Sequence, residues 1–237
     1  MDNEHIVHSY DSELNQLQNM IAEMGGLAEM QLARAIAALV KYDADAANDI
    51  VEKDRRIDQL EDEIDELAVR LIAKRQPMAG DLRTIITGLK VSANLERIGD
   101  YAKNIAKRTV TISTATGLRG PIATIARMAA LVQSMIKNVL DAYIAHDADK
   151  ADDVRARDQE VDQIHSGLFR ELLTYMMEDP RNITPCTHLL FIAKNIERVG
   201  DHVTSVAEQI HYMVHGELPL GERPKQDLSS FTLVEPK

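Results

Sequence analysis

Acidic side chains spaced four residues apart recur at matching positions in the two halves of the sequence. Residues i and i+4 of an α-helix project from the same face, one turn apart. Carboxylates placed this way on two neighbouring helices could bind hard or borderline metal ions. Two pairs occur in each half: Asp54 with Asp58 and Glu96 with Asp100, then Asp158 with Asp162 and Glu197 with Asp201. The sequence therefore predicts one metal site in each half.

A third position extends each predicted site. Glu61 lies three residues after Asp58, and its counterpart His165 lies three residues after Asp162. A carboxylate followed at i+3 by histidine is a spacing used in di-iron helical bundles. Zinc, iron and manganese suit such ligands, and magnesium is a further candidate that would retain more water. The alternative interpretation is a solvated acidic helix face on which the pairs coincide by chance.

Long amphipathic helices must position these residues. Apolar residues recur at intervals of three and four in both halves, and no segment shows the alternation typical of a strand. Prolines fall between the helical patterns, where they interrupt no helix interior. We therefore predict six helices, at about residues 5–42, 45–75, 80–113, 121–146, 149–178 and 183–215.

The predicted helices form an internal repeat. The segment Asn94–Asp100 reads NLERIGD, and Asn195–Asp201 reads NIERVGD. A repeat of about 100 residues is too long for a solenoid unit, so it indicates duplication of a three-helix bundle. We expect an all-α fold of two tandem, pseudo-symmetric three-helix bundles with six long helices. The expected boundaries are residues 1–116 and 117–216, followed by a flexible tail at 217–237.

The composition of the chain argues against several classes of function. The chain has 27 Lys and Arg against 38 Asp and Glu, and its net charge of −11 argues against nucleic acid or an anionic membrane as a partner. Its one cysteine, Cys186, excludes an internal disulfide and fits a reducing compartment. The polar N-terminus predicts no secretory signal, and no apolar run predicts a membrane span. Motifs for nucleotide binding and for triad hydrolysis are missing from the sequence.

Other residues in the repeated motif also suggest roles. Arg97 and Arg198 recur, and we interpret them as partners in helix salt bridges in preference to contacts with another protein. Gly99 and Gly200 lie within helices, where Gly costs about 0.5–1 kcal/mol relative to Ala. They therefore predict a close approach of helices or room beside a metal. His202 has no histidine counterpart in the first half, which favours packing over metal ligation.

Together these features resemble the PhoU family of accessory regulators of phosphate-specific transport. The resemblance covers about residues 5–215 and rests on the duplicated layout, the paired ERIGD and ERVGD segments, and the connection KRQPMAGDLR at residues 74–83. It implies multinuclear metal clusters held by E/D-x-x-x-D motifs, which are here the eight paired carboxylates. The second half departs further from the family pattern, because Asp179-Pro180 replaces Gln-Pro and His165 replaces a glutamate.

The resemblance also implies a function, which is that of a cytoplasmic, non-enzymatic adaptor. Such proteins link the phosphate ABC transporter to the phosphate-sensing histidine kinase and restrain the phosphate regulon. The expected partners are therefore the transporter subunits, the kinase and a second copy of the chain in a homodimer. Contact with the inner face of the membrane is expected only through these partners, without direct insertion, and no nucleic acid is expected to bind.

Two other functions stay open. A ferritin-like metalloenzyme also uses carboxylates on bundle helices, but its sites have two inward Glu-x-x-His motifs, and here Asp162 with His165 approaches one. An oxidation assay with ferrous iron and oxygen would identify it. A histidine phosphotransfer module would present a histidine on a helical bundle, with His146, His165 and His202 as candidates. Incubation with a phosphorylated kinase would identify that activity.

Overall fold

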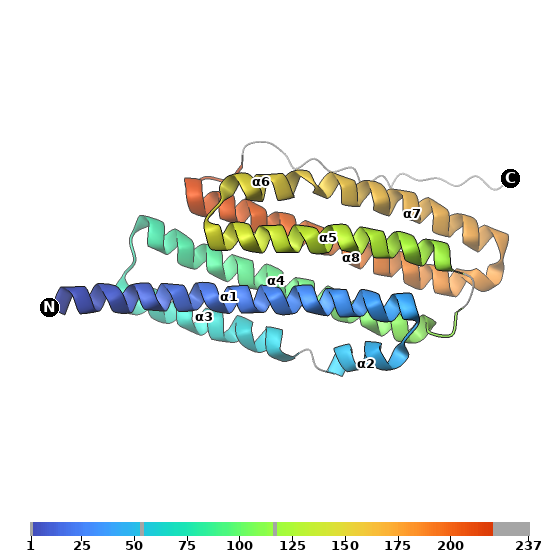
Figure 1. Ribbon diagram of the computed structural model, residues 1–237, viewed down its shortest axis with the longest axis horizontal. Helices are drawn as coiled ribbons and strands as arrows, with labels where there is room; N and C mark the ends of the chain where they lie inside the picture. Colours follow the sequence, from blue (N-terminus) through green and yellow to red (C-terminus); the bar gives the residue numbers. More distant parts are fainter. Residues whose placement is uncertain (1, 53–54, 116–117, 220–237) are drawn as a thin grey trace.

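The computed structural model describes residues 2–52, 55–115 and 118–219, and this part of the chain is all-α, without a strand (Figure 1). The prediction of an all-α fold is therefore confirmed. None of the described helices combines the length and the apolar character needed to cross a membrane. The elements are α1 (Asp2–Lys41), α2 (Ala44–Glu52), α3 (Arg55–Arg75), α4 (Ala79–Ile112), α5 (Arg119–Ala145), α6 (Ala148–Ala156), α7 (Asp158–Glu178), the 3-10 helix η1 (Pro180–Asn182) and α8 (Ile183–His215).

The two halves have the same arrangement of helices. In the first half, α2 and α3 pack against the long helices α1 and α4, and in the second half α6 and α7 pack against α5 and α8. The halves join through α4 against α8 and α1 against α5. In Figure 1, α1 and α5 lie in front of α4 and α8, while α2 with α3 and α6 with α7 line the two opposite edges. Each half is thus a three-helix bundle, in which α2 with α3, or α6 with α7, takes the middle position.

The apolar stripes of these helices form one continuous core. On α3, Ile57, Leu60 and Ile64 are at most 3% exposed, and full burial of such a side chain is worth roughly 1.5–3 kcal/mol. The core also crosses between the halves. Gly25 of α1 lies so close to Leu140 of α5 that a Cβ atom at position 25 would collide with the leucine side chain. The two bundles therefore share their packing along the α1/α5 contact.

The six predicted helices agree with two three-helix bundles, and two of them each contain two described helical segments. The predicted helix 45–75 is α2 and α3, on either side of residues 53–54, which lie outside the described residues. The predicted helix 149–178 is α6 and α7, which meet at Arg157. There the amide of Arg157 donates to the carbonyl of the residue three positions before it, at 3.2 Å, and its carbonyl accepts from the amide three positions later, at 3.0 Å. These tighter bonds interrupt the α-helix while the apolar spacing continues, so periodicity alone predicts one helix.

The turn that ends α1 is repeated at the end of α5. Tyr42 and His146 both adopt the left-handed conformation, with φ of 55° and 53°. The next residues, Asp43 and Asp147, cap the helices that follow, because the Oδ1 atom of each accepts the amide hydrogen three positions later, at 2.9 and 3.0 Å. The duplication seen in the sequence therefore extends to backbone geometry and capping.

Candidate functional site

The first acidic face lies where α3 packs against α4. We define it as Asp58 and Glu61 on α3 with Glu96 and Asp100 on α4. Asp58 is exposed, and the other three are partly buried. Glu61 feels the charge of Asp58, and Glu96 feels the charges of Glu61 and Asp100, so the four carboxylates form one electrostatic cluster. Asp54, also predicted here, lies outside the described residues.

Burial and crowding raise the pKa of the two glutamates of the first acidic face. Burial, the charge of Asp100 and a hydrogen bond with Asp100 together raise the pKa of Glu96 to about 7. Burial, followed by the charges of neighbouring acidic residues on α3, raises the pKa of Glu61. Arg97 opposes these effects, with Nε at 3.5 Å from Glu96 Oε2 and Nη1 at 3.6 Å from Asp100 Oδ2. The guanidinium is 59% exposed and its contacts are long, so it neutralises the cluster only in part.

The second acidic face lies at the matching position between α7 and α8, and it is buried. Asp158, Asp162 and His165 on α7 and Glu197 on α8 are each at most 5% exposed, and Asp201 is partly buried. The residues on α7 are spaced at i, i+4 and i+7, which places them on one side of the helix. The first of them also lies in the first turn of α7, where a carboxylate interacts favourably with the helix dipole.

A lysine places a positive charge next to Glu197 of the second acidic face. Nζ of Lys194 lies 2.9 Å from Oε2 of Glu197, and the glutamate side chain is only 7% exposed. A buried carboxylate is costly without such a partner. Sequence reasoning missed Lys194, although it precedes Glu197 by three residues on the same helix, a spacing that favours an ion pair.

The two glycines of the repeated motif allow close approach in both halves, as predicted. A Cβ atom at Gly99 would lie 2.9 Å from Cδ1 of Ile57, and a Cβ atom at Gly200 would lie 3.2 Å from Oδ1 of Asp158. In the first half the close neighbour is thus an apolar side chain. In the second half it is a carboxylate of the acidic face, so Gly200 makes room for a predicted metal ligand.

The donor chemistry of both faces suits metal ions. The first acidic face offers carboxylate oxygens alone, and the second adds the imidazole of His165, a ligand that zinc, iron and manganese accept. Among the described residues, no three His, Cys, Asp or Glu side chains converge as the ligands of one ion would. Binding would therefore require side chains to rotate toward a shared ion, which would relieve the repulsion between neighbouring carboxylates.

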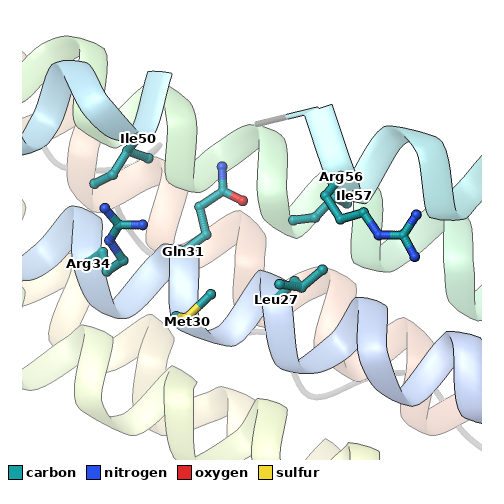
Figure 2. A pocket seen from close by; sticks show the side chains of 7 residues that line it. All are labelled: Leu27, Met30, Gln31, Arg34, Ile50, Arg56 and Ile57. Atoms are coloured by element: carbon teal, nitrogen blue, oxygen red, sulfur yellow. The ribbon is translucent and has the colours of Figure 1, made fainter. Parts of the chain in front are cut away.

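A pocket of about 80 Å³ lies beside the first acidic face, between α1 and the facing ends of α2 and α3 (Figure 2). Figure 2 shows Gln31 pointing from α1 into the gap between Ile50 of α2 and Ile57 of α3. Oε1 of Gln31 lies 3.7 Å from the Cβ position of Gly99, so the pocket adjoins the repeated motif. Two arginines at its rim, Arg34 and Arg56, already form ion pairs, at 2.6 Å and at 3.0 Å. Its walls are Leu27, Met30, Gln31, Arg34, Ile50, Arg56 and Ile57.

The other predicted residues behave differently in the two halves. The predicted helix salt bridge is confirmed for Arg97 and is wrong for Arg198, whose guanidinium lies 5.9 Å from the ring centroid of Tyr101. His202 has the packing role expected of it. Its Nδ1 atom lies 2.8 Å from Oδ1 of Asn94, and its ring centroid lies 5.6 Å from that of Tyr101. Arg198 and His202 both contact Tyr101, so both lie at the contact between α4 and α8.

Comparison with known proteins gives matches over almost the whole chain. The model of the PhoU domain matches residues 21–109 and again residues 125–210. The chain is 50% identical over 230 residues to the phosphate-specific transport system accessory protein PhoU homolog of Rhizobium meliloti, covering 97% of both chains. It is also 50% identical over 227 residues to the PhoU homolog of Caulobacter vibrioides, covering 96% of this chain and 99% of that protein.

Solved structures agree with these matches. The crystal structure of PhoU from Pseudomonas aeruginosa is similar with a TM-score of 0.84 at 38% identity, covering 88% of this chain and 100% of that one. The phosphate transport system regulatory protein PhoU from Streptococcus pneumoniae gives a TM-score of 0.83 at 30% identity, covering 89% of this chain and 99% of that one. Because the domain matches twice and the similarity covers both bundles, the protein belongs to the PhoU family.

Proposed function

We propose that this protein is an accessory regulator of phosphate-specific transport. The observation that carries the proposal is its 50% identity, over 97% of both chains, with the PhoU homolog of Rhizobium meliloti, whose name assigns it to the phosphate-specific transport system. The name of the Streptococcus pneumoniae structure describes a regulatory protein of phosphate transport, which supports the same role.

In this proposal the protein acts by binding other proteins and catalyses no reaction. It restrains phosphate uptake and phosphate-regulon signalling by linking subunits of the phosphate ABC transporter to the phosphate-sensing histidine kinase. It does so on the cytoplasmic side of the membrane, as a homodimer. The long α4 and α8 helices support an adaptor role, because they present an extended surface that crosses both bundles.

The proposal includes metal binding at the two acidic faces. The residues that would hold the ions are Asp54, Asp58, Glu61, Glu96 and Asp100 in the first half, and Asp158, Asp162, His165, Glu197 and Asp201 in the second. A bound zinc, iron or manganese ion would add positive charge to that supplied by Arg97 and Lys194. The raised pKa of Glu96 supports this role, because burial and then the charge of Asp100 disfavour its ionised form, which a cation would stabilise.

The two alternative functions have less support. His165 is 3% exposed and His202 packs against Tyr101 and Asn94, so neither presents its imidazole to a phosphorylated partner. His146 is exposed, but it lies in the left-handed turn after α5. Asp162 with His165 approaches the carboxylate-x-x-His motif of ferritin-like enzymes. Glu208 with His211 on α8 has the same spacing, but Glu208 pairs with Arg155 and His211 pairs with Asp152.

Deletion of the gene in the host organism tests the regulatory proposal. A phosphate-regulon reporter should then stay active in phosphate-rich medium, and expression of the intact chain from a plasmid should restore repression. A reporter that remains repressed in the deletion strain would contradict the proposal. Metal analysis of the protein, purified without a histidine tag, tests the metal component separately, because a metal-free regulator would still restore repression.

A further inference from the structure

Polar contacts recur along the interface of α4 with α8. The two helices run antiparallel, since Thr87 Oγ1 donates to the carbonyl of Gln209 at 3.5 Å, and Arg108 Nη1 lies 3.4 Å from His188 Nδ1. The facing residues recur at intervals of seven, from Thr87 to Arg108 on α4 and from His188 to Gln209 on α8. All are polar or aromatic, so this contact differs from the apolar core on the other side of the same helices.

A second pair of rows flanks this contact on the outer surface. It consists of every seventh residue from Lys90 to Thr111 on α4 and from Phe191 to Tyr212 on α8. We call these rows and the facing residues between them the α4/α8 seam. The seam contains no acidic residue, although the chain has 38 Asp and Glu against 27 Lys and Arg. It is therefore a basic strip on an acidic protein.

Three cations of the seam rest on aromatic rings of the opposite half. Nζ of Lys90 lies 5.8 Å from the ring centroid of Tyr212, and Cζ of Arg108 lies 4.1 Å from that of Phe191. Arg198 lies over Tyr101 between them, as described above. In the described part of the chain none of these three cations lies within ion-pair distance of a carboxylate. The rings hold the cations in place and leave their charge available to an anion.

The spacing of the cations indicates the shape of the anion. Eighteen residues separate Lys90 from Arg108, which is about 27 Å along a helix, and Arg198 lies between them. A single small anion cannot reach all three. Phe191 is 51% exposed beside Arg108 and offers an apolar contact as well. An elongated ligand that carries several carboxylates and an apolar group fits these requirements.

The width of the strip distinguishes a peptide from a larger polyanion. The two acidic faces flank the seam, on the α3 side and on the α7 side. A membrane or a nucleic acid would bring its phosphates against these carboxylates as well as the seam, within the Debye length of about 8 Å at physiological salt. One helix is about 10–12 Å wide and would contact the seam alone.

We propose that the α4/α8 seam is the docking surface for an acidic helical segment of a partner protein. This inference goes beyond the proposed function, because it assigns a surface and a recognition chemistry and does not depend on metal or on the identity of the partner. Lys90, Arg198 and Arg108 would pair with carboxylates spaced along one side of the segment, and Phe191 would contact an apolar residue near its end.

The test uses fluorescence anisotropy with a labelled helical peptide of about 20 residues, long enough to span the three cations. The peptide carries glutamates on one side, and a matched peptide carries glutamine at the same positions. The full chain should bind the glutamate peptide saturably at about 0.15 M salt, and should not bind the glutamine peptide. The double variant Arg108→Glu, Arg198→Glu should bind at least tenfold more weakly.

A matched control separates the seam from net charge. Arg70 is exposed on α3, away from the seam, so Arg70→Glu should leave the affinity unchanged within twofold. If the double variant unfolds, as judged by circular dichroism, Arg108→Gln with Arg198→Gln gives the same test without adding charge. Absence of binding by the parent, or equal binding by parent and double variant, would overturn the proposal.

Two further measurements address other occupants of the seam. If the double variant changes the oligomeric state in sedimentation velocity, the seam is an interface between copies of this chain and the proposal is wrong. If vesicles of anionic phospholipid bind the parent and not the double variant, the occupant is a membrane, and the proposal is again wrong. Unchanged oligomeric state and no vesicle binding are the expected results.

Discussion

The two acidic faces come from the same repeated motif but differ in their contact with water. In the first half, Asp58 is exposed and Arg97 provides a long, solvent-exposed counter-charge. In the second half, four of the five members are at most 5% exposed, and Lys194 provides a close counter-charge to Glu197. Matching sequence positions therefore have different electrostatic environments.

Exposed and buried carboxylates differ in how their charge is compensated. The charge of carboxylates at the surface can be compensated by solvent and salt, so a change in the charge of the first acidic face need not unfold the protein. Buried carboxylates must be neutralised within the fold, so changes in the second acidic face alter stability directly. The counter-ions differ accordingly: Lys194 serves the second face, and Arg198, the counterpart of Arg97, lies over the ring of Tyr101.

The largest expected effect concerns metal binding at the first acidic face. Metal at one hundred times its dissociation constant should raise the free energy of unfolding of the parent by about 2.7 kcal/mol. Asp58→Asn with Asp100→Asn should abolish most of this gain and lower the metal content. Without metal, the same variant should be at least as stable as the parent, because like charges at i, i+4 repel. Urea denaturation with metal and with chelator, together with elemental analysis, measures both effects.

The matching variant in the second half is the control. Asp162→Asn alters a buried group, so we expect it to lower the free energy of unfolding by about 1–3 kcal/mol even in chelator. It should leave metal at the first acidic face. If the variants of the two halves change the free energy of unfolding equally in chelator, or if the first variant keeps its metal, the two acidic faces do not differ as predicted.

The second prediction compares the two counter-ions. Lys194→Met keeps the aliphatic stem and leaves Glu197 buried without its cation. Breaking a fully buried pair costs about 3–5 kcal/mol, and because Lys194 is 38% exposed we expect a smaller loss, about 2 kcal/mol. Arg97→Met should cost about 0.5 kcal/mol or less, as for a surface pair. Urea denaturation in chelator gives both values. Adding Glu197→Gln to Lys194→Met should recover part of the loss, and no recovery would show that packing, not charge, is responsible.

The third prediction compares the glycines. Alanine gains about 0.5–1 kcal/mol over glycine within a helix, but its Cβ must fit. At Gly99 the obstacle is the end of the Ile57 side chain, which can rotate, so Gly99→Ala should be nearly neutral. At Gly200 the obstacle is the buried Asp158 carboxylate, so Gly200→Ala should lower the free energy of unfolding by about 1 kcal/mol. Thermal and urea denaturation of the pair measures the difference, and a stabilised Gly200→Ala protein would contradict it.

The smallest effect is expected at the repeated turn. His146 is exposed in the left-handed conformation, so His146→Gly should raise stability by about 0.5–1 kcal/mol. Tyr42 has the same backbone conformation but packs against the core, so Tyr42→Gly should lower stability. Differential scanning calorimetry can resolve the opposite signs. A loss of stability in both variants would mean that the histidine ring also contributes packing.

The sequence was sufficient for the fold and for the positions of the acidic residues, because both follow from helical periodicity and from the repeat. It was not sufficient for the break between α6 and α7 at Arg157, since the apolar spacing continues through it. Nor did it predict that Asp158 and Glu197 are buried while Asp58 is exposed, because burial depends on how α7 packs against α8. The acid-free rows of the seam can be read in the sequence, but their juxtaposition requires the antiparallel contact of α4 with α8.

The contact of α4 with α8 also bears on how the chain evolved. Tyr101 and His202 occupy equivalent positions in the two halves, and their rings meet each other across the seam. A residue that touches its own equivalent lies on a twofold axis, which is the geometry of an isologous dimer interface. A half-length ancestor could have formed this interface between two identical subunits. Fusion of the two copies released each position from symmetry, so that Ala93 and Lys194, or Glu61 and His165, could diverge. Two acidic faces with different properties are what such a fusion permits and a symmetric dimer forbids.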